Sequence, residues 1–165
     1  MSDNQRYIEF FLNASGALYE IDCLELSHPQ FAVPFRYTMA NPLGLDVQHE
    51  DGSPQRYNYQ LMGITAQTVR NDLDQKLDAT IVDYDDTLIE AIEEIESGAV
   101  QVVLRKYRSD DLTSPVHTIK TLEARKISKD SDGKVTFAAE AASLNSVGTG
   151  ELYTLSRFPL LRGTL

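Results

Sequence analysis

The sequence contains one cysteine, Cys23, and no tryptophan. A single cysteine excludes a disulfide within the chain and a zinc site built from cysteines. Cys23 lies in a run that alternates like a strand, so we expect a buried, unreactive thiol. The three histidines (His28, His49 and His117) are widely spaced and lack the periodicity of metal ligands. The sequence therefore predicts no metal site and no bound cofactor.

Long apolar runs and basic residues are also scarce. No apolar run approaches the ~20 residues that a membrane-spanning helix needs, so we expect no membrane span. The first residues, MSDNQRYIEFF, lack the basic and then apolar pattern of a signal peptide. The net charge of -10 disfavours binding to nucleic-acid phosphates, and we expect no sequence-specific nucleic-acid partner. The glycine-rich phosphate loop and the common hydrolase and zinc-protease motifs are missing as well.

The chain does have the length and pattern of one β-rich domain. Its 165 residues, 42% of them hydrophobic, are enough for a single domain over residues 1–165. Alternating apolar and polar residues, separated by turn signals, predict strands at 16–26, 31–38, 56–62 with a continuation over 63–69, 77–83, 100–107, 118–127 and 134–142. Residues 46–54 are interpreted as a turn-rich connection, and residues 3–13 as a further candidate helix. We predict a mainly β (α+β) fold, an antiparallel β-barrel or sandwich with one short helix packed on it.

The stretch DYDDT, residues 83–87, follows an apolar run and has two interpretations. Residues two apart in a strand share a face, which would bring Asp83 and Asp85 together at the strand's end. This Asp-x-Asp-x-Thr pattern is similar to the nucleophile motif of haloacid-dehalogenase-like phosphatases. The resemblance implies that Asp83 attacks phosphorus and that Asp85 acts as general acid and base, both beside Mg²⁺.

The same stretch also has the pattern of a helix start. Thr87 and Glu90 have the spacing of a capping box, and an apolar stripe follows them. Gly98 marks a stop, so we predict a helix over residues 87–97. The residues downstream are typical of strands rather than of the alternating strands and helices of that phosphatase fold. We therefore predict no catalytic residues and no enzyme, with the Mg²⁺-dependent phosphatase as the alternative.

Three segments, taken in order, resemble a family of uncharacterised tail proteins of long-tailed (siphovirus-type) bacteriophages. The first is LELSHP at 24–29, followed by VPFR at 33–36. The second is the apolar strand 79–85 that leads into the helix, and the third is the segment YTLSRFPLL at 153–161. The resemblance runs from about Leu18 to Gly163, and residues 41–55 depart from the family's pattern.

The resemblance implies a structural protein of the virion, similar to tail-tube and hub domains. Such proteins are components of the tail tip or baseplate hub and form oligomeric rings around the tail channel. The expected partners are further copies of the chain, as a trimer or hexamer, together with other tail-tip, tube and tape-measure proteins. The expected locations are the virion and, during assembly, the host cytoplasm. No catalytic residue belongs to the family's pattern.

Ring subunits expose edge strands and apolar tails to their neighbours. We therefore expect the N-terminal segment 1–15 and the C-terminal segment 144–165 to engage neighbouring subunits, although both could also be ordinary core. The predicted interface residues are aromatic or aliphatic: Phe10, Phe11, Leu152, Tyr153, Leu155, Phe158, Leu160 and Leu161. A negative channel would repel the DNA backbone, and Glu93, Glu94, Asp110 and Asp111 are candidates for lining it.

Overall fold

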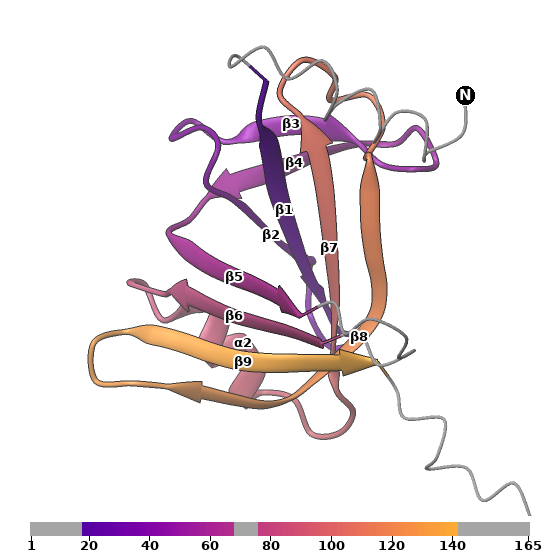
Figure 1. Ribbon diagram of the computed structural model, residues 1–165. Helices are drawn as coiled ribbons and strands as arrows, with labels where there is room; N and C mark the ends of the chain where they lie inside the picture. The colour runs from indigo at the N-terminus through magenta and orange to yellow at the C-terminus, as the bar shows by residue number, and fades with distance from the viewer. Residues whose placement is uncertain (1–17, 68–75, 142–165) are drawn as a thin grey trace, which may run out of the picture.

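The computed structural model describes residues 18–67 and 76–141. These residues form nine strands and one short helix (Figure 1). The elements are β1 (Glu20–Ser27), β2 (Phe35–Thr38), β3 (Leu45–Gln48), β4 (Pro54–Tyr59), β5 (Met62–Gln67), β6 (Lys76–Val82), α2 (Thr87–Glu93), β7 (Val100–Arg108), β8 (His117–Lys129) and β9 (Lys134–Ala141). The predicted mainly β class is confirmed for this part of the chain.

All nine strands belong to one sheet in the order β3-β4-β2-β1-β7-β8-β9-β6-β5. Neighbouring strands are antiparallel except for β2 and β4, which are parallel. Within the described residues the sheet is therefore mixed and open, with β3 and β5 at its edges. Of the two predicted architectures, the closed antiparallel barrel is wrong for these residues, and the sandwich is not confirmed.

Most predicted strands are present, and two pairs of consecutive predicted strands, 16–26 with 31–38 and 118–127 with 134–142, are antiparallel neighbours. β1 pairs with β2, and β8 pairs with β9. One strand was missed: β3 pairs with β4 around a turn in which Gly52 N–H donates to the His49 carbonyl. The reason is that β3 has only four residues, two of them exposed and polar, so its alternation is too short to separate from the turn signals around it.

The sheet curves strongly along β7 and β8. The pairing register shifts between Val102 and Leu104 and again between Ala124 and Lys126, as happens at bulges that bend a strand. β8 pairs with β7 along its first part and with β9 along its second, so the sheet changes direction along this strand. Figure 1 shows β1 and β7 running steeply while β6 and β9 run across them.

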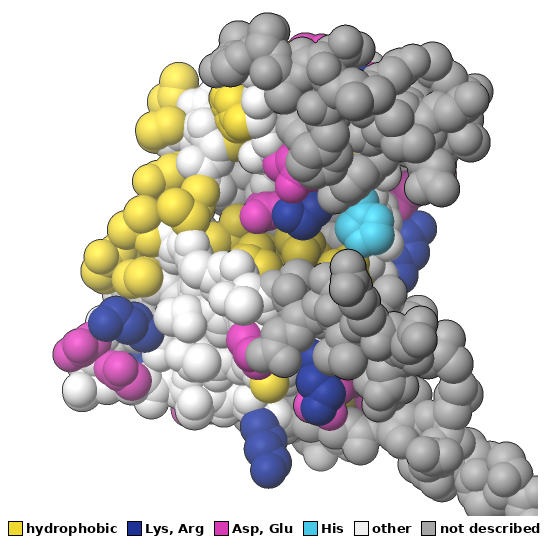
Figure 2. Space-filling view, viewed as in Figure 1, with side chains coloured by type: hydrophobic (Ala, Val, Ile, Leu, Met, Phe, Trp, Pro, Cys, Tyr) yellow, Lys and Arg dark blue, Asp and Glu magenta, His cyan; other side chains and the backbone are white. Residues whose placement is uncertain are grey.

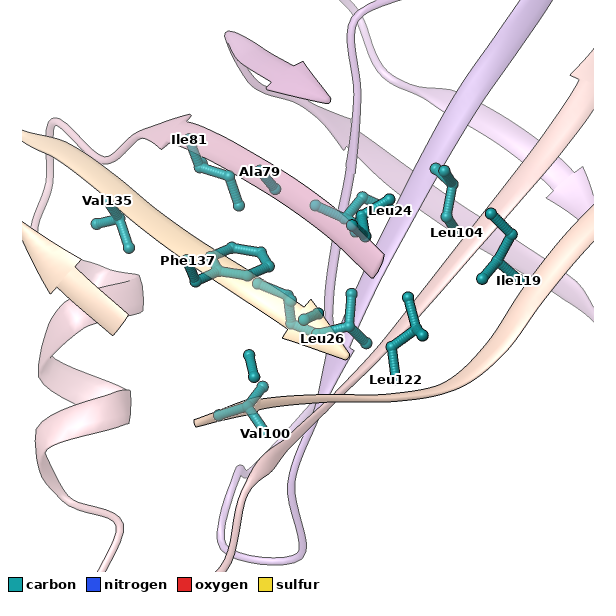
Figure 3. Close-up of a cluster of buried hydrophobic side chains, with 14 of the residues drawn as sticks. Leu24, Leu26, Ala79, Ile81, Val100, Leu104, Ile119, Leu122, Val135 and Phe137 are labelled. Atoms are coloured by element: carbon teal, nitrogen blue, oxygen red, sulfur yellow. The ribbon is translucent and has the colours of Figure 1, made fainter. Parts of the chain in front are cut away.

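The curved sheet encloses an apolar core on its concave face (Figure 3). Alternate residues of β1, β6, β7, β8 and β9 point inward, and the short helix adds Leu88. The buried members are Leu24, Leu26, Leu77, Ala79, Ile81, Leu88, Val100, Val102, Leu104, Ile119, Leu122, Ala124, Val135, Phe137 and Ala139. Each large aliphatic side chain buried here contributes roughly 1.5–3 kcal/mol to folding.

β1 and β7 are also buried on their opposite face. There the hairpin β3–β4 packs over them and forms a second, smaller cluster, which consists of Ile21, Cys23, Val47, Tyr57 and Tyr107. Cys23 is fully buried, and burial raises the pKa of its thiol to about 12. The predicted burial of Cys23 is confirmed.

The helix is shorter than predicted and begins differently. Its N-cap is Asp86, in the left-handed region at φ 60°, and Asp86 makes no side-chain capping bond. The predicted capping box at Thr87 is therefore wrong. An N–H at the start of the helix, that of Ile89, donates to Asp83 Oδ2 at 3.0 Å. The helix ends at Glu93 rather than at residue 97, although Ile95 still packs on the core. The candidate helix at 3–13 lies outside the described residues.

Candidate functional site

A groove of about 510 Å³ lies between the start of β1, the end of β2 and the edge strand β5. It is lined by Tyr19, Glu20, Ile21, Asp22, Met39, Ala40, Met62 and Ile64. Figure 2 shows a hollow on this face with hydrophobic side chains along its rim and charged side chains on its wall. A groove with this composition suits an extended peptide segment better than a small polar ligand.

Large apolar side chains are exposed at this groove. Tyr19 is 57% exposed and Met39 is 49% exposed, and both line the groove. Tyr59 and Leu61, just before β5, are also exposed. Exposed apolar surface of this kind marks contact sites for other chains.

Among the described residues no strand pairs with the backbone of β5 on the groove side, where the Met62 N–H donates to Met39 Sδ at 3.3 Å. The Val82 N–H donates to the Leu61 carbonyl, so the odd-numbered residues that follow Leu61 bond to β6. The even-numbered residues, Met62, Ile64 and Ala66, therefore direct their N–H and C=O groups away from β6. Among the described strands β5 pairs with β6 alone. This edge could accept one further strand.

The first residues of β1 form a second strand edge at the groove, with which no described strand pairs. β1 pairs with β7 from Glu20 onward but with β2 only from Cys23 onward. The Tyr19 carbonyl accepts from Ser109 on the β7 side, so Glu20 and Asp22 direct their backbone groups to the opposite side. The Asp22 carbonyl there accepts from the Thr38 hydroxyl at 3.0 Å. The groove is thus flanked by two strand edges with pairing capacity.

The groove wall is acidic. Lys106 Nζ lies 3.1 Å from Glu20 Oε2 and 3.1 Å from Asp22 Oδ1, so one ammonium serves two carboxylates. The nearby Arg108 pairs with Asp110 at 2.5 Å. Glu20, Asp22 and Lys106 together carry a net charge of -1, which favours a cationic occupant.

A polar cluster lies on the other face of β1 and β7, under the hairpin β3–β4. Arg105 Nη1 donates to the Tyr57 hydroxyl at 3.1 Å, and His49 Nε2 lies 3.0 Å from the same oxygen. Because this oxygen accepts from Arg105, its own hydrogen is available for His49. Burial, followed by the charge of Arg105, lowers the pKa of His49 below its ordinary value. His49 is thereby held neutral at pH 7.

Two carboxylates neutralise the buried arginine. Glu25 Oε2 lies 2.6 Å from Arg36 Nε and 3.6 Å from Arg105 Nη1. Glu50 accepts from Arg105 Nε at 3.2 Å and pairs with Lys120 at 3.0 Å. Burial alone would raise the pKa of Glu50, but hydrogen bonds from its own backbone N–H and from the Lys120, Thr118 and Arg105 side chains lower it to about 2.

This cluster connects the hairpin β3–β4 to the sheet, and we assign it a structural role. The Tyr57 hydroxyl, the His49 ring and the Arg105 guanidinium each have bonded partners. The cluster was not predicted from the sequence. One signal for it is Arg105, which follows apolar residues in the strand VQVVLRKY. A charge buried at such a position needs partners from elsewhere in the fold.

The acids of the DYDDT stretch are separated by the structure. Asp83 is buried and bonds to the helix start, whereas Asp85 is exposed. Asp86 forms an ion pair with Lys129. The strand before them, β6, lies between antiparallel neighbours β5 and β9. Within the described residues, no group of three or more His, Cys, Asp or Glu side chains is arranged to hold a metal ion.

The structure does not test the predicted interface residues. All eight lie outside the described residues, as do the whole of segments 1–15 and 144–165; they are Phe10, Phe11, Leu152, Tyr153, Leu155, Phe158, Leu160 and Leu161. The acidic candidates for a channel lining fall into two places. Glu93 and Glu94 end the helix before β7, and Asp110 and Asp111 follow β7, which is roughly 27 Å long.

No protein-family model matches this chain, and neither does any curated protein. The helix in the described part of the chain is too short and too polar to cross a membrane.

Proposed function

We propose that this chain is a structural protein of a bacteriophage tail tip or baseplate, one subunit of a ring around the tail channel. The observation that carries the proposal is the open sheet with an unpaired apolar edge at β5. Exposed edges of this kind are usually blocked in proteins that remain monomeric. The order of the LELSHP, ATIVDYD and YTLSRFPLL segments supports the assignment to tail proteins.

The two edges of the sheet favour a ring over a symmetric dimer. β3 and β5 differ in length and exposure, and the N–H of the β3 residue Gln48 already donates to the Leu112 carbonyl. A contact between two different surfaces is head-to-tail, and head-to-tail contacts close into rings when the rotation allows. The net charge of -10 is compatible with a channel that DNA passes without binding.

The Mg²⁺-dependent phosphatase is the weaker proposal. It needs Asp83 as a free nucleophile, whereas Asp83 Oδ2 is bonded to the N–H of Ile89. Phosphate-ester turnover with Mg²⁺ that disappears in Asp83→Asn would favour it. If the chain is a structural protein, the wild type and Asp83→Asn should show the same background rate of phosphate-ester hydrolysis.

The proposal is tested by the oligomeric state of the purified chain. We expect light scattering and negative-stain electron microscopy to show a closed ring with a central channel, alone or on assembled tail tubes. Ala66→Pro removes an N–H that points away from β6 and should abolish the ring, while Ala66→Val keeps that N–H and should preserve it. A wild-type chain that stays monomeric at every concentration, also with tail tubes present, would contradict the proposal.

A further inference from the structure

We infer that the groove between β1 and β5 receives the C-terminal segment, residues 152–161, of a neighbouring copy of the chain. This inference rests on the proposed ring and names the contact that builds it. The segment would add as a strand and satisfy the unpaired edges of β1 and β5. Its apolar side chains would cover Met39, Met62 and Ile64.

The composition of the segment fits such a strand. Residues 152–158, LYTLSRF, are rich in aromatic and β-prone residues and contain neither glycine nor proline. Pro159 then limits the length of the added strand, since proline cannot donate to a ladder. An added strand obtains affinity from main-chain hydrogen bonds and specificity from alternate side chains in pockets.

The charges of the two surfaces are complementary. Residues 152–165 contain Arg157 and Arg162 and no acidic side chain. The groove wall holds Glu20 and Asp22 with Lys106 as the shared cation. The fourteen C-terminal residues therefore carry positive side-chain charge toward a wall on which Glu20, Asp22 and Lys106 carry a net charge of -1. Because the wall is partly exposed, assembly should weaken as salt concentration rises.

The length and composition of the connecting chain permit exchange between copies. The last described residue, Ala141, ends β9, and residues 142–151 (ASLNSVGTGE) separate it from the segment. Ten residues span at most ~35 Å when fully extended, so the segment can dock away from the end of β9. Segments rich in Gly and Ser are suited to such linkers.

The test mixes two variants that are broken on opposite sides of the contact. Met39→Arg places a charge in the groove at a half-exposed position, and Arg157→Glu reverses the charge of the segment. We expect each variant alone to be monomeric and the mixture to form one-to-one heterodimers, because one intact groove and one intact segment remain. Leu43→Arg, at an apolar residue that is 82% exposed and does not line the groove, is the matched control and should still form rings.

A second measurement does not depend on the ring. A synthetic peptide of residues 151–165 should bind saturably to the chain that lacks those residues, and Met39→Arg should weaken binding at least tenfold. Hydrogen exchange should show the amides of Glu20 and Ile64 protected by the peptide, with the interior amide of Leu24 unchanged.

The outcomes separate the two proposals. Rings that persist without residues 151–165, or in both single variants, would overturn this inference. The proposal that the chain forms a ring would still stand. A mixture of Met39→Arg and Arg157→Glu that forms no heterodimers would also overturn it. That result is expected if each segment docks in the groove of its own chain. Binding of the peptide 2–16 in place of 151–165 would assign the groove to the N-terminal segment instead. Monomers of the wild-type chain under every condition would refute the ring itself.

Discussion

The two faces of strands β1 and β7 are buried by different chemistry. On the concave face, Leu24 and Leu104 meet only apolar neighbours. On the opposite face, the adjacent residues Cys23 and Arg105 belong to a layer with buried hydrogen bonds and ion pairs. Apolar burial is non-directional and supplies most of the folding free energy. The polar layer depends on geometry, so we assign it the role of fixing where the hairpin β3–β4 docks.

The largest effect is expected on the apolar face. Leu104→Ala removes a fully buried side chain and should lower the free energy of unfolding by about 2–5 kcal/mol. Urea denaturation followed by circular dichroism would measure the change. Leu43→Ala, at an exposed position, is the control and should stay within about 0.5 kcal/mol of the wild type. A small loss in Leu104→Ala would mean that the concave face is not the main source of stability.

A smaller but still large effect is expected on the polar face. Arg105→Met removes one partner of Glu50 and one partner of the Tyr57 hydroxyl. It should cost about 3 kcal/mol, the lower end of the range for a broken buried pair, because Glu50 keeps Lys120, Tyr57 keeps His49 and Glu25 keeps Arg36. The control is Arg56→Ala, whose partner Asp46 is 70% exposed, and its cost should be below about 1 kcal/mol. Equal costs at the two arginines would contradict the distinction between buried and exposed pairs.

The smallest effect is a pH dependence of the polar face. His49 has a lowered pKa when folded, so the unfolded chain binds its proton more readily below pH 6.5. Stability should therefore rise with pH and fall as the pH drops below about 6.5. Glu50 acts in the same direction at lower pH, with loss from about pH 4.5 toward pH 2.

His49→Gln keeps a partner for Tyr57 without the titration. Denaturation midpoints between pH 7 and pH 5 should depend less on pH in this variant than in the wild type. His117→Gln, at an exposed histidine, is the comparison and should keep the wild-type slope. An unchanged slope in His49→Gln would exclude His49 as its source.

Local patterns predicted the strands whose alternation was long. The hairpin β8–β9 followed from Val135, Phe137 and Ala139 on one face with a turn before them, and all three are buried. Cys23 was placed correctly for the same reason. The four-residue β3 and the Asp86 N-cap were not predictable from spacing alone, because a short strand and a left-handed residue depend on what packs against them.

The candidate groove was beyond the reach of sequence patterns. Met39 follows β2 and Ile64 belongs to β5, and they share a wall only because the sheet bends along β8. The polar cluster is similar: Arg105 is far in the chain from Tyr57 and Glu50 and meets them through the fold. Nothing in the local sequence around any one of them specifies the other two.

The sequence by itself determined the class of the fold, the burial of alternate residues and the net charge, because these follow from local periodicity and composition. Only the tertiary structure decided that the sheet is open and mixed, that β5 is an edge and that Asp83 serves a helix start. Strand order and edge pairing arise from contacts between residues far apart in the chain. Such contacts are selected by the packing of the whole sheet, and no short segment contains them.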